Sequence, residues 1–173
     1  MNIAIFGASG FVGNYILDEL KRYNYNAQIL IRRGSESKIK PSKNNKIILG
    51  DISDKKAIQN TLKGADTIIY TIGIIREFKY KKIYFDDLHH KGVNAVIAEA
   101  EKINIKRFIL MSANGVKKNG TKYQMSKYLG ELALINSSLK WTIFRPSLIF
   151  GDSNGKEEFC SQLKRDMLSL PFP

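Results

Sequence analysis

Three glycines near the N-terminus have the spacing of a phosphate-binding loop. The segment Gly7-Ala8-Ser9-Gly10-Phe11-Val12-Gly13 directly follows an apolar run at residues 2–6 and precedes an amphipathic segment. In such loops the first glycine permits a tight turn, the second lets the backbone approach a diphosphate, and the third allows close helix packing. Free N–H groups at the helix start would bind the anion. The segment therefore predicts a dinucleotide site, and a turn that binds nothing is the alternative.

Two arginines occupy the place where the choice between nicotinamide cofactors is usually made. NAD-selective sites carry Asp or Glu about 20 residues beyond the glycine loop, where the carboxylate binds the ribose 2′-hydroxyl. This chain has Arg32 and Arg33 there, and guanidinium groups can pair bidentately with a 2′-phosphate. The pattern favours NADP(H). NAD(H) is the alternative, with both arginines simply solvated.

Two further strand ends are predicted to contact the cofactor. Asp51 follows the third apolar run and can accept a hydrogen bond from the adenine amino group, while Ile52 can cover the adenine ring. Thr71-Ile72-Gly73 ends the fourth run and is small enough for the cofactor to lie against the backbone. Ordinary strand-end chemistry is the alternative for both segments.

Tyr123 and Lys127 are four residues apart and would share one face of a helix. An ammonium near a phenol favours the phenolate, which lowers the phenol pKa from about 10 toward the range of acid–base catalysis. The same lysine can hydrogen-bond a nicotinamide ribose. A surface pair is the alternative, but the position of the pair after the fifth apolar run favours the catalytic interpretation.

Apolar runs alternate with amphipathic segments along the chain, which is typical of a parallel sheet flanked by helices. The predicted strands are residues 2–6, 27–31, 46–50, 66–71, 106–111 and 140–144. The predicted helices are residues 11–23, 54–62, 87–103 and 123–136. Six such strands favour the doubly wound order 3-2-1-4-5-6, so the expected fold is α/β of the Rossmann type.

Periodicity and capping residues predict how these helices begin and pack. The third helix would bury Val93, Val96, Ile97 and Ala100, and the fourth would turn Leu129, Leu132 and Ala133 to the sheet. Ser53 is the expected N-cap of the second helix, and Gly64 its stop. The connection over residues 73–86 is long for a compact domain, which indicates a functional loop.

Composition limits the number of domains and the classes of function. With 173 residues and 43% hydrophobic content, the chain can form one domain and a fragment of another. The absence of a secretion signal and of any apolar run approaching about 18 residues predicts a cytoplasmic protein without a membrane span. Cys160 is the only cysteine, and His89 and His90 lack a third ligand in sequence. We therefore expect no metal site, and we expect both histidines to be partly exposed structural residues.

The net charge of +12 raises the question of an anionic partner. The basic residues are scattered over three loops: Lys38, Lys40, Lys43 and Lys46; Arg76, Lys79, Lys81 and Lys82; Lys117, Lys118 and Lys122. No segment arranges basic and aromatic residues in an RNA-binding motif. The pattern favours a solvated surface over nucleic-acid binding and leaves open peripheral association with a membrane.

Together these motifs resemble the extended and atypical short-chain dehydrogenase/reductase superfamily over residues 1–151. The matching segments are G-A-S-G-F-V-G, Gly50-Asp51, residues 106–112, Tyr123 with Lys127, and residues 141–151. Within that superfamily, residues 72–77 and Arg145-Pro146-Ser147 resemble the branch that contains the nucleotide-binding accessory subunit of respiratory complex I. Bacterial and archaeal relatives in this branch are usually called NAD-dependent epimerase/dehydratase-like proteins.

The resemblance implies roles for individual residues. Tyr123 would be the general acid–base and Lys127 a ligand of the cofactor ribose, with further cofactor contacts from Ser112, Pro146 and Ser147. Active members commonly use a Ser or Thr to polarise the substrate carbonyl, and Ala113 stands at that place here. Ser112, one residue earlier, is the candidate substitute. If it cannot act, catalysis is slow or absent and the cofactor is structural.

The resemblance also implies a domain division. Residues 1–151 would form the NAD(P)-binding Rossmann domain, and residues 152–173 only the start of a truncated C-terminal substrate region. Within that region, Phe159, Leu163, Met167 and Leu170 predict an amphipathic helix.

Two functions follow from the motifs. The leading hypothesis is an NADP(H)-dependent oxidoreductase or epimerase acting on a small carbonyl or sugar-type substrate. The rival is a non-catalytic NADP(H)-binding accessory, assembly or sensor subunit. The sequence predicts neither the substrate's identity nor an oligomeric state.

Overall fold

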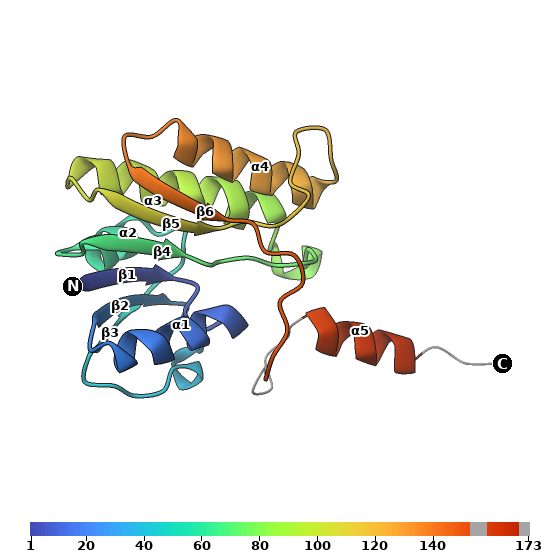
Figure 1. Cartoon of the computed structure of the whole chain (residues 1–173), viewed down its shortest axis with the longest axis horizontal. Helices are drawn as coiled ribbons and strands as arrows, with labels where there is room; N and C mark the ends of the chain where they lie inside the picture. Colours follow the sequence, from blue (N-terminus) through green and yellow to red (C-terminus); the bar gives the residue numbers. More distant parts are fainter. Residues whose placement is uncertain (153–158, 170–173) are drawn as a thin grey trace.

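The computed structural model describes residues 1–152 and 159–169, and within them six parallel strands form one sheet (Figure 1). The order β3-β2-β1-β4-β5-β6 confirms the predicted doubly wound arrangement. The strands are β1 (Asn2–Phe6), β2 (Asn26–Ile31), β3 (Asn45–Leu49), β4 (Thr67–Tyr70), β5 (Arg107–Met111) and β6 (Lys140–Phe144). The strand order reverses between the paired neighbours β1 and β4, so the connections after them leave in opposite directions, and α/β sheets bind ligands at such a point.

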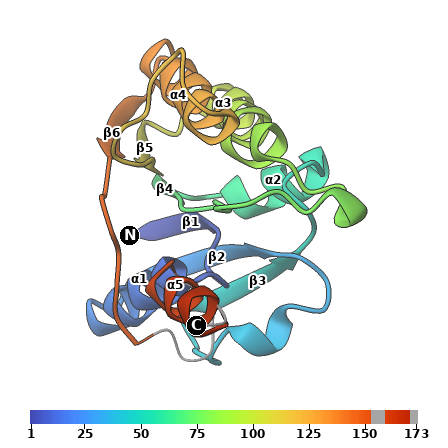
Figure 2. The same ribbon diagram turned by 90° about the vertical axis from the view of Figure 1, so that its right-hand side faces the viewer.

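Helices cover both faces of the sheet (Figure 2). They are α1 (Phe11–Arg22), α2 (Lys55–Leu62), α3 (Gly92–Lys102), α4 (Lys122–Ile135) and α5 (Phe159–Leu168). Short helical turns are η1 (Glu36–Lys38), η2 (Lys79–Lys81) and η3 (Asp87–Lys91), the last of them π-helical. In Figure 1, α5 stands beyond the carboxyl ends of the strands. No helix among the described residues is long and apolar enough to cross a membrane.

Two apolar clusters hold the layers together. The larger cluster packs α2, α3 and α4 against one face of the sheet. It contains Val93, Val96, Ile97 and Ala100, all buried, so the predicted inward face of α3 is confirmed. The smaller packs α1 against β1 and β2 on the other face. Burial of such aliphatic side chains contributes about 1.5–3 kcal/mol each, so the sheet between the two clusters is a rigid base for the loops at its carboxyl edge.

Two local predictions are wrong. Asp54, not Ser53, caps α2: its carboxylate accepts hydrogen bonds from the amides of Lys56 (2.9 Å) and Ala57 (3.1 Å). Ser53 is unavailable because its hydroxyl donates to Asp51 at 3.0 Å. The second error concerns Leu132 of α4; Ala133 packs against the larger cluster as predicted, and the fully buried residues of α4 are Ser126, Lys127, Gly130, Glu131 and Leu134. Leu132 is 38% exposed, because the inward face of α4 carries polar groups that pair inside the site and hydrophobic periodicity cannot detect them.

Candidate functional site

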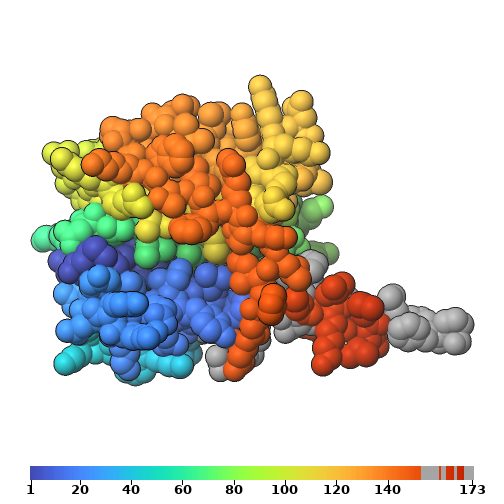
Figure 3. All heavy atoms as spheres, viewed as in Figure 1, coloured from blue at the N-terminus to red at the C-terminus, as the bar shows by residue number. Residues whose placement is uncertain are grey.

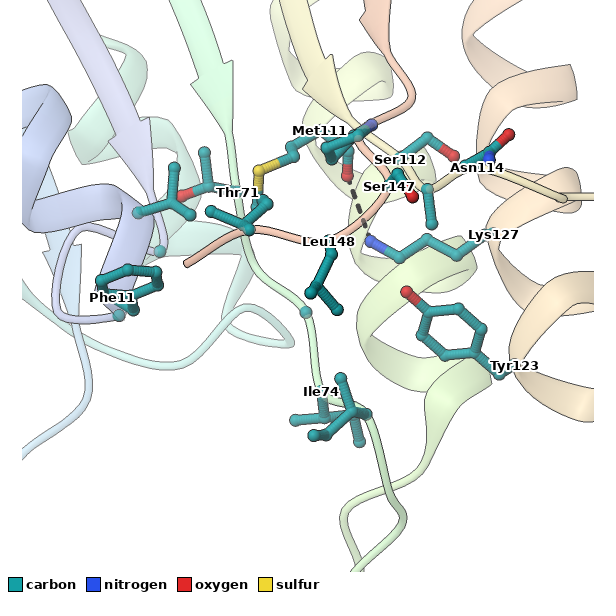
Figure 4. A pocket seen from close by; sticks show the side chains of 18 of the residues that line it. Phe11, Thr71, Ile74, Met111, Ser112, Asn114, Tyr123, Lys127, Ser147 and Leu148 are labelled. Atoms are coloured by element: carbon teal, nitrogen blue, oxygen red, sulfur yellow. Dashed lines mark hydrogen bonds between the residues drawn. The ribbon is translucent and has the colours of Figure 1, made fainter. Parts of the chain in front are cut away.

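A cavity of about 750 Å³ opens at the carboxyl ends of β1, β4, β5 and β6. This volume lies in the range of small-molecule and cofactor pockets. The sequence-predicted residues that line it are Gly7, Gly10, Phe11, Val12, Gly13, Thr71, Gly73, Ser112, Tyr123, Lys127, Pro146 and Ser147. The fold therefore brings the glycine loop and the Tyr123–Lys127 pair, more than a hundred residues apart in sequence, to one cavity (Figure 4).

The glycine loop has the shape of an anion cradle. Gly7 has a φ of +102°, and a Cβ there would lie 2.7 Å from both Ile72 N and Thr71 Oγ1. A Cβ on Gly13 would lie 2.6 Å from Ala8 Cα, so α1 sits directly on the loop. No side chain caps α1 at Gly10, and its first turn carries no acidic residue. The amide end of this helix is thus left for an external anion, as the diphosphate of a dinucleotide requires.

A strap formed by residues 145–152 crosses the carboxyl edge of the sheet, and Figure 3 shows it passing from the upper to the lower half of the molecule. It is fixed at both ends. The Asn114 amide donates to the Pro146 carbonyl at 2.8 Å, and the Tyr15 hydroxyl donates to the Asp152 carbonyl at 2.9 Å. The strap therefore joins α1 to the loop after β5 and covers one side of the cavity with its apolar residues Leu148 and Ile149.

Lys127 is buried, with 6% of its surface exposed, and its ammonium donates to the Met111 carbonyl at 3.1 Å (Figure 4). Burial lowers the pKa of Lys127 to about 8, while the nearby carboxylate of Glu131 raises it. The ammonium form therefore still predominates at neutral pH. A buried cation beside the cavity suits a hydroxyl-rich or anionic ligand group.

Tyr123 lies one helical turn before Lys127, and its hydroxyl points into the same cavity (Figure 4). Burial raises the pKa of its phenol, which contradicts the expected lowering by Lys127. The ammonium is turned toward the Met111 carbonyl, and aromatic rings surround the phenol ring. In this state Tyr123 is a protonated phenol.

Glu131 connects α4 to the strap. Its carboxylate accepts from Arg145 Nε at 2.9 Å and from Arg145 Nη2 at 2.6 Å. Burial alone would raise the pKa of Glu131, but hydrogen bonds from Arg145 and the positive charges of Arg145 and Lys127 lower it below its usual value. The Ser112 hydroxyl contributes to this lowering, although it forms no geometrically complete hydrogen bond among the described residues. The pair fixes the chain immediately before Pro146 and Ser147.

His89 is buried, with 2% of its surface exposed, so the expectation of a partly exposed residue is wrong. Its ring lies between Phe85 and Tyr123 and contacts both. His89 lies four residues before Val93 and seven before Val96, so the helical period places it on their face; its polar side chain is buried because both ring nitrogens find hydrogen-bond partners, Ile74 and Ser126, in the folded chain. His90 is only partly buried and pairs with Asp86.

The other predicted cofactor residues do not line the cavity, and their roles stay predictions. Ala8 and Ile52 are buried in the two apolar clusters, and Ile72 packs against the larger one. Asp51 accepts hydrogen bonds from the amide and hydroxyl of Ser53. The remaining ones are Ser9 in the glycine loop and the exposed pair Arg32 and Arg33 after β2.

Other lining residues were not predicted. Ile74, Ile75, Leu148, Ile149 and Leu163 make one side of the cavity apolar. Asn114 also lines it; its Oδ1 accepts from the Gly115 amide at 2.9 Å, which leaves the side-chain NH2 group as a donor. The dipeptide Asn114-Gly115, three residues after the end of β5, was the available signal, since such pairs mark tight turns.

The fold and the cavity together define a Rossmann-type domain that binds a nicotinamide dinucleotide. The family described as NAD(P)H-binding matches residues 7–166, and the chain belongs to this family. The loop at Gly7, Gly10 and Gly13 fits the diphosphate of such a cofactor, because the glycines let the backbone turn tightly and α1 begin directly on the loop, with no side chain capping its amide end.

Known relatives are similar over most of the chain. Ceramide reductase from Caulobacter vibrioides is 28% identical over 150 residues, covering 86% of this chain and 46% of that protein. NADH dehydrogenase [ubiquinone] 1 alpha subcomplex subunit 9, mitochondrial, from Arabidopsis thaliana is 28% identical over 160 residues, covering 85% of this chain and 38% of that protein. The chain thus spans less than half the length of these two relatives.

The fold is also that of solved structures. The Bordetella bronchiseptica enzyme WbmH, solved in complex with NAD+, superposes with a TM-score of 0.77 over 90% of this chain and 58% of that one, at 19% identity. At this identity the likeness concerns the fold. It supports the assignment of the β1–α1 junction to a Rossmann architecture.

Proposed function

We propose that this protein is an NADP(H)-dependent oxidoreductase or epimerase that acts on a small carbonyl or sugar-type substrate. The observation that carries the proposal is the shared cavity, which places the Tyr123 hydroxyl and the Lys127 ammonium at the same opening as the glycine loop. The similarity to ceramide reductase supports a reductase.

The residues divide the work of such a reaction. The amides of the glycine loop hold the diphosphate, and Lys127 hydrogen-bonds the nicotinamide ribose, while the cofactor supplies or accepts the hydride. Because burial raises the pKa of Tyr123, its phenol stays protonated at neutral pH and donates its proton to the carbonyl oxygen of a substrate. A protonated phenol favours the reductive direction.

Arginines after β2 support NADP(H) over NAD(H). Arg32 and Arg33 are exposed, so their guanidinium groups are free of the core to approach a 2′-phosphate. The same proposal assigns residues 1–151 to cofactor binding and 152–173 to the start of a substrate region, to which α5 contributes Leu163 as a lining residue.

A non-catalytic cofactor-binding subunit is the second candidate, and Ser112 favours it. Its hydroxyl oxygen is buried and inaccessible, although a substrate carbonyl would need to reach it. Ala113 offers no hydroxyl in its place. The similarity to a complex I subunit points the same way. Asn114 provides the counter-argument, because its side-chain NH2 can donate into the cavity.

Turnover separates the two candidates. We expect NADPH oxidation with at least one member of a panel of aldehydes, ketones and nucleotide sugars. Tyr123→Phe should lower that rate by about 10²-fold or more. Its cofactor affinity, measured by nicotinamide-fluorescence titration, should be unchanged. Tyr128→Phe, on the same helix, is the matched control and should leave the rate intact. Equal rates in Tyr123→Phe and the wild type would remove the catalytic assignment, and binding without turnover would establish the accessory subunit.

A further inference from the structure

His89 stands at the junction between η3 and α4. Its backbone carbonyl lies against Gly130, where a Cβ would have no room. The missing side chain at Gly130 lets the two helical segments approach closely, which brings the imidazole beside the ring of Tyr123. The ring itself does not line the cavity.

Hydrogen bonds determine which nitrogen of His89 carries the proton. The Ile74 amide can only donate, and it lies 3.2 Å from Nε2, so Nε2 is the acceptor. Nδ1 therefore carries the proton and donates to Ser126 Oγ at 3.0 Å. The Ser126 hydroxyl in turn donates to the Tyr123 carbonyl at 2.9 Å. The chain of bonds joins the loop after β4 to the first turn of α4.

The imidazole of His89 is neutral, and both of its nitrogens are hydrogen-bonded. Burial lowers the pKa of His89 to about 2, and the charge of Lys127 contributes to the lowering. Because both nitrogens are already hydrogen-bonded, the ring has neither a spare proton nor a free acceptor for a substrate. The contacts of the ring are those of a group that holds its neighbours in position.

Two aromatic rings, those of His89 and Phe85, pack against the Tyr123 ring. His89 meets the Tyr123 ring edge to face, with centroids 5.4 Å apart and planes at 89°, and Phe85 does so at 5.4 Å and 78°. Phe85 and His89 stack on each other at 5.5 Å and 23°. Aromatic pairs favour such arrangements. The contacts leave the phenol hydroxyl directed into the cavity (Figure 4).

We propose that His89, as the Nδ1-protonated tautomer, is the positioning residue of Tyr123, and that it fixes Ile74 on the cavity wall at the same time. The kinetic consequence rests on the proposed function, whereas the tautomer and the restraint on Tyr123 do not require turnover. Asn at position 89 can replace both polar contacts, because its amide oxygen can accept from Ile74 and its NH2 can donate to Ser126. Phe can replace only the ring packing.

The tautomer is tested first, in the unaltered chain. In spectra of the protein labelled with ¹⁵N-histidine, with His89 assigned through His89→Asn, we expect a protonated Nδ1, an unprotonated Nε2 and no titration between about pH 5 and 8. A cationic ring in that range, or a proton on Nε2, would overturn the proposal.

The restraint on Tyr123 is tested with ¹³Cζ-labelled tyrosine, its resonance assigned through Tyr123→Phe. His89→Phe should shift and broaden that resonance, and should lower kcat by about tenfold or more with cofactor Kd within about twofold. His89→Asn should restore both readouts, and His90→Asn, on the same turn, should change neither. An unaltered Tyr123 resonance in folded His89→Phe contradicts the proposal.

A second variant covers the case in which His89→Phe fails to fold. Ser126→Ala removes the bond to the Tyr123 carbonyl and must also displace the resonance, or the proposal fails. If the wild type shows no turnover at all, the proposed function fails, and the two sets of resonances still decide the role of His89.

Discussion

The two sides of the cavity are built from different parts of the polypeptide. The phosphate side is made of backbone, and its three glycines work by having no side chains. The chemical side is made of side chains from three segments, η3, α4 and the strap. His89 packs on Tyr123 and bonds to Ser126, and Arg145 pairs with Glu131, whose charge acts on Lys127. A backbone site can therefore be identified from residue spacing alone, whereas a side-chain site is defined by contacts between residues distant in sequence.

Gly13→Val tests the backbone side and should have the largest effect. The added Cβ would overlap Ala8 and the Gly7 carbonyl, so α1 must move off the loop. Overpacking of this kind costs about 1–3 kcal/mol or more of unfolding free energy, and we expect cofactor affinity to fall by about 100-fold. Calorimetric titration and urea denaturation measure the two effects.

Gly34→Ala is the control for Gly13→Val. Its Cβ would meet open space, so only the positive φ of +81° is penalised, at about 1–2 kcal/mol. Cofactor affinity in this variant should stay unchanged. Equal cofactor affinities in Gly13→Val and Gly34→Ala would show that the phosphate side tolerates side chains. The two sides of the cavity would then not differ in the way described.

Glu131→Gln tests the side-chain side. The buried carboxylate loses its charge against Arg145, which should cost about 1–3 kcal/mol of stability at neutral pH. Because the folded-state pKa of Glu131 is below its ordinary value of 4.5, its contribution is complete above that pH and is lost as the pH falls through the folded-state pKa. The wild type should therefore lose its advantage over the variant on acidification below about pH 5.

Exposed Glu19 provides the control for that pH series, since its contact with Arg22 at 3.6 Å is solvated. Glu19→Gln should change stability by less than about 0.5 kcal/mol. A stability difference between the wild type and Glu131→Gln that stays constant from neutral pH to about pH 3 would contradict the linkage.

The sequence allowed most of the fold to be predicted. Each strand end lies within one residue of its expected position, because buried parallel strands are short apolar runs bounded by polar residues. The inward face of α4 could not be predicted in this way. Lys127 and Glu131 are polar residues whose burial depends on the Met111 carbonyl and on Arg145, and these partners meet them only in the folded chain. The burial of His89 could not be predicted for the same reason, because its partners Ile74 and Ser126 meet it only in the folded chain.

Arg32→Asp tests the phosphate side with a smaller expected effect on cofactor affinity, because it changes an exposed side chain outside the glycine loop. If guanidinium groups hold the 2′-phosphate, the ratio of NADPH to NADH affinity should fall by about tenfold, equivalent to about 1.4 kcal/mol. Arg22→Asp, with the same change of charge at the far end of α1, should leave the ratio unaltered. An unchanged ratio in Arg32→Asp would refute the preference for NADP(H).

The amides of residues 7–13 allow the most direct measurement. In a ¹⁵N-labelled sample titrated with NADPH, we predict saturable shifts that are largest for the amides of Gly10 to Gly13, where α1 begins without a side-chain cap. A folded sample whose amides do not respond to NADPH or NADH up to about 1 mM would contradict the assignment of this junction as the diphosphate site.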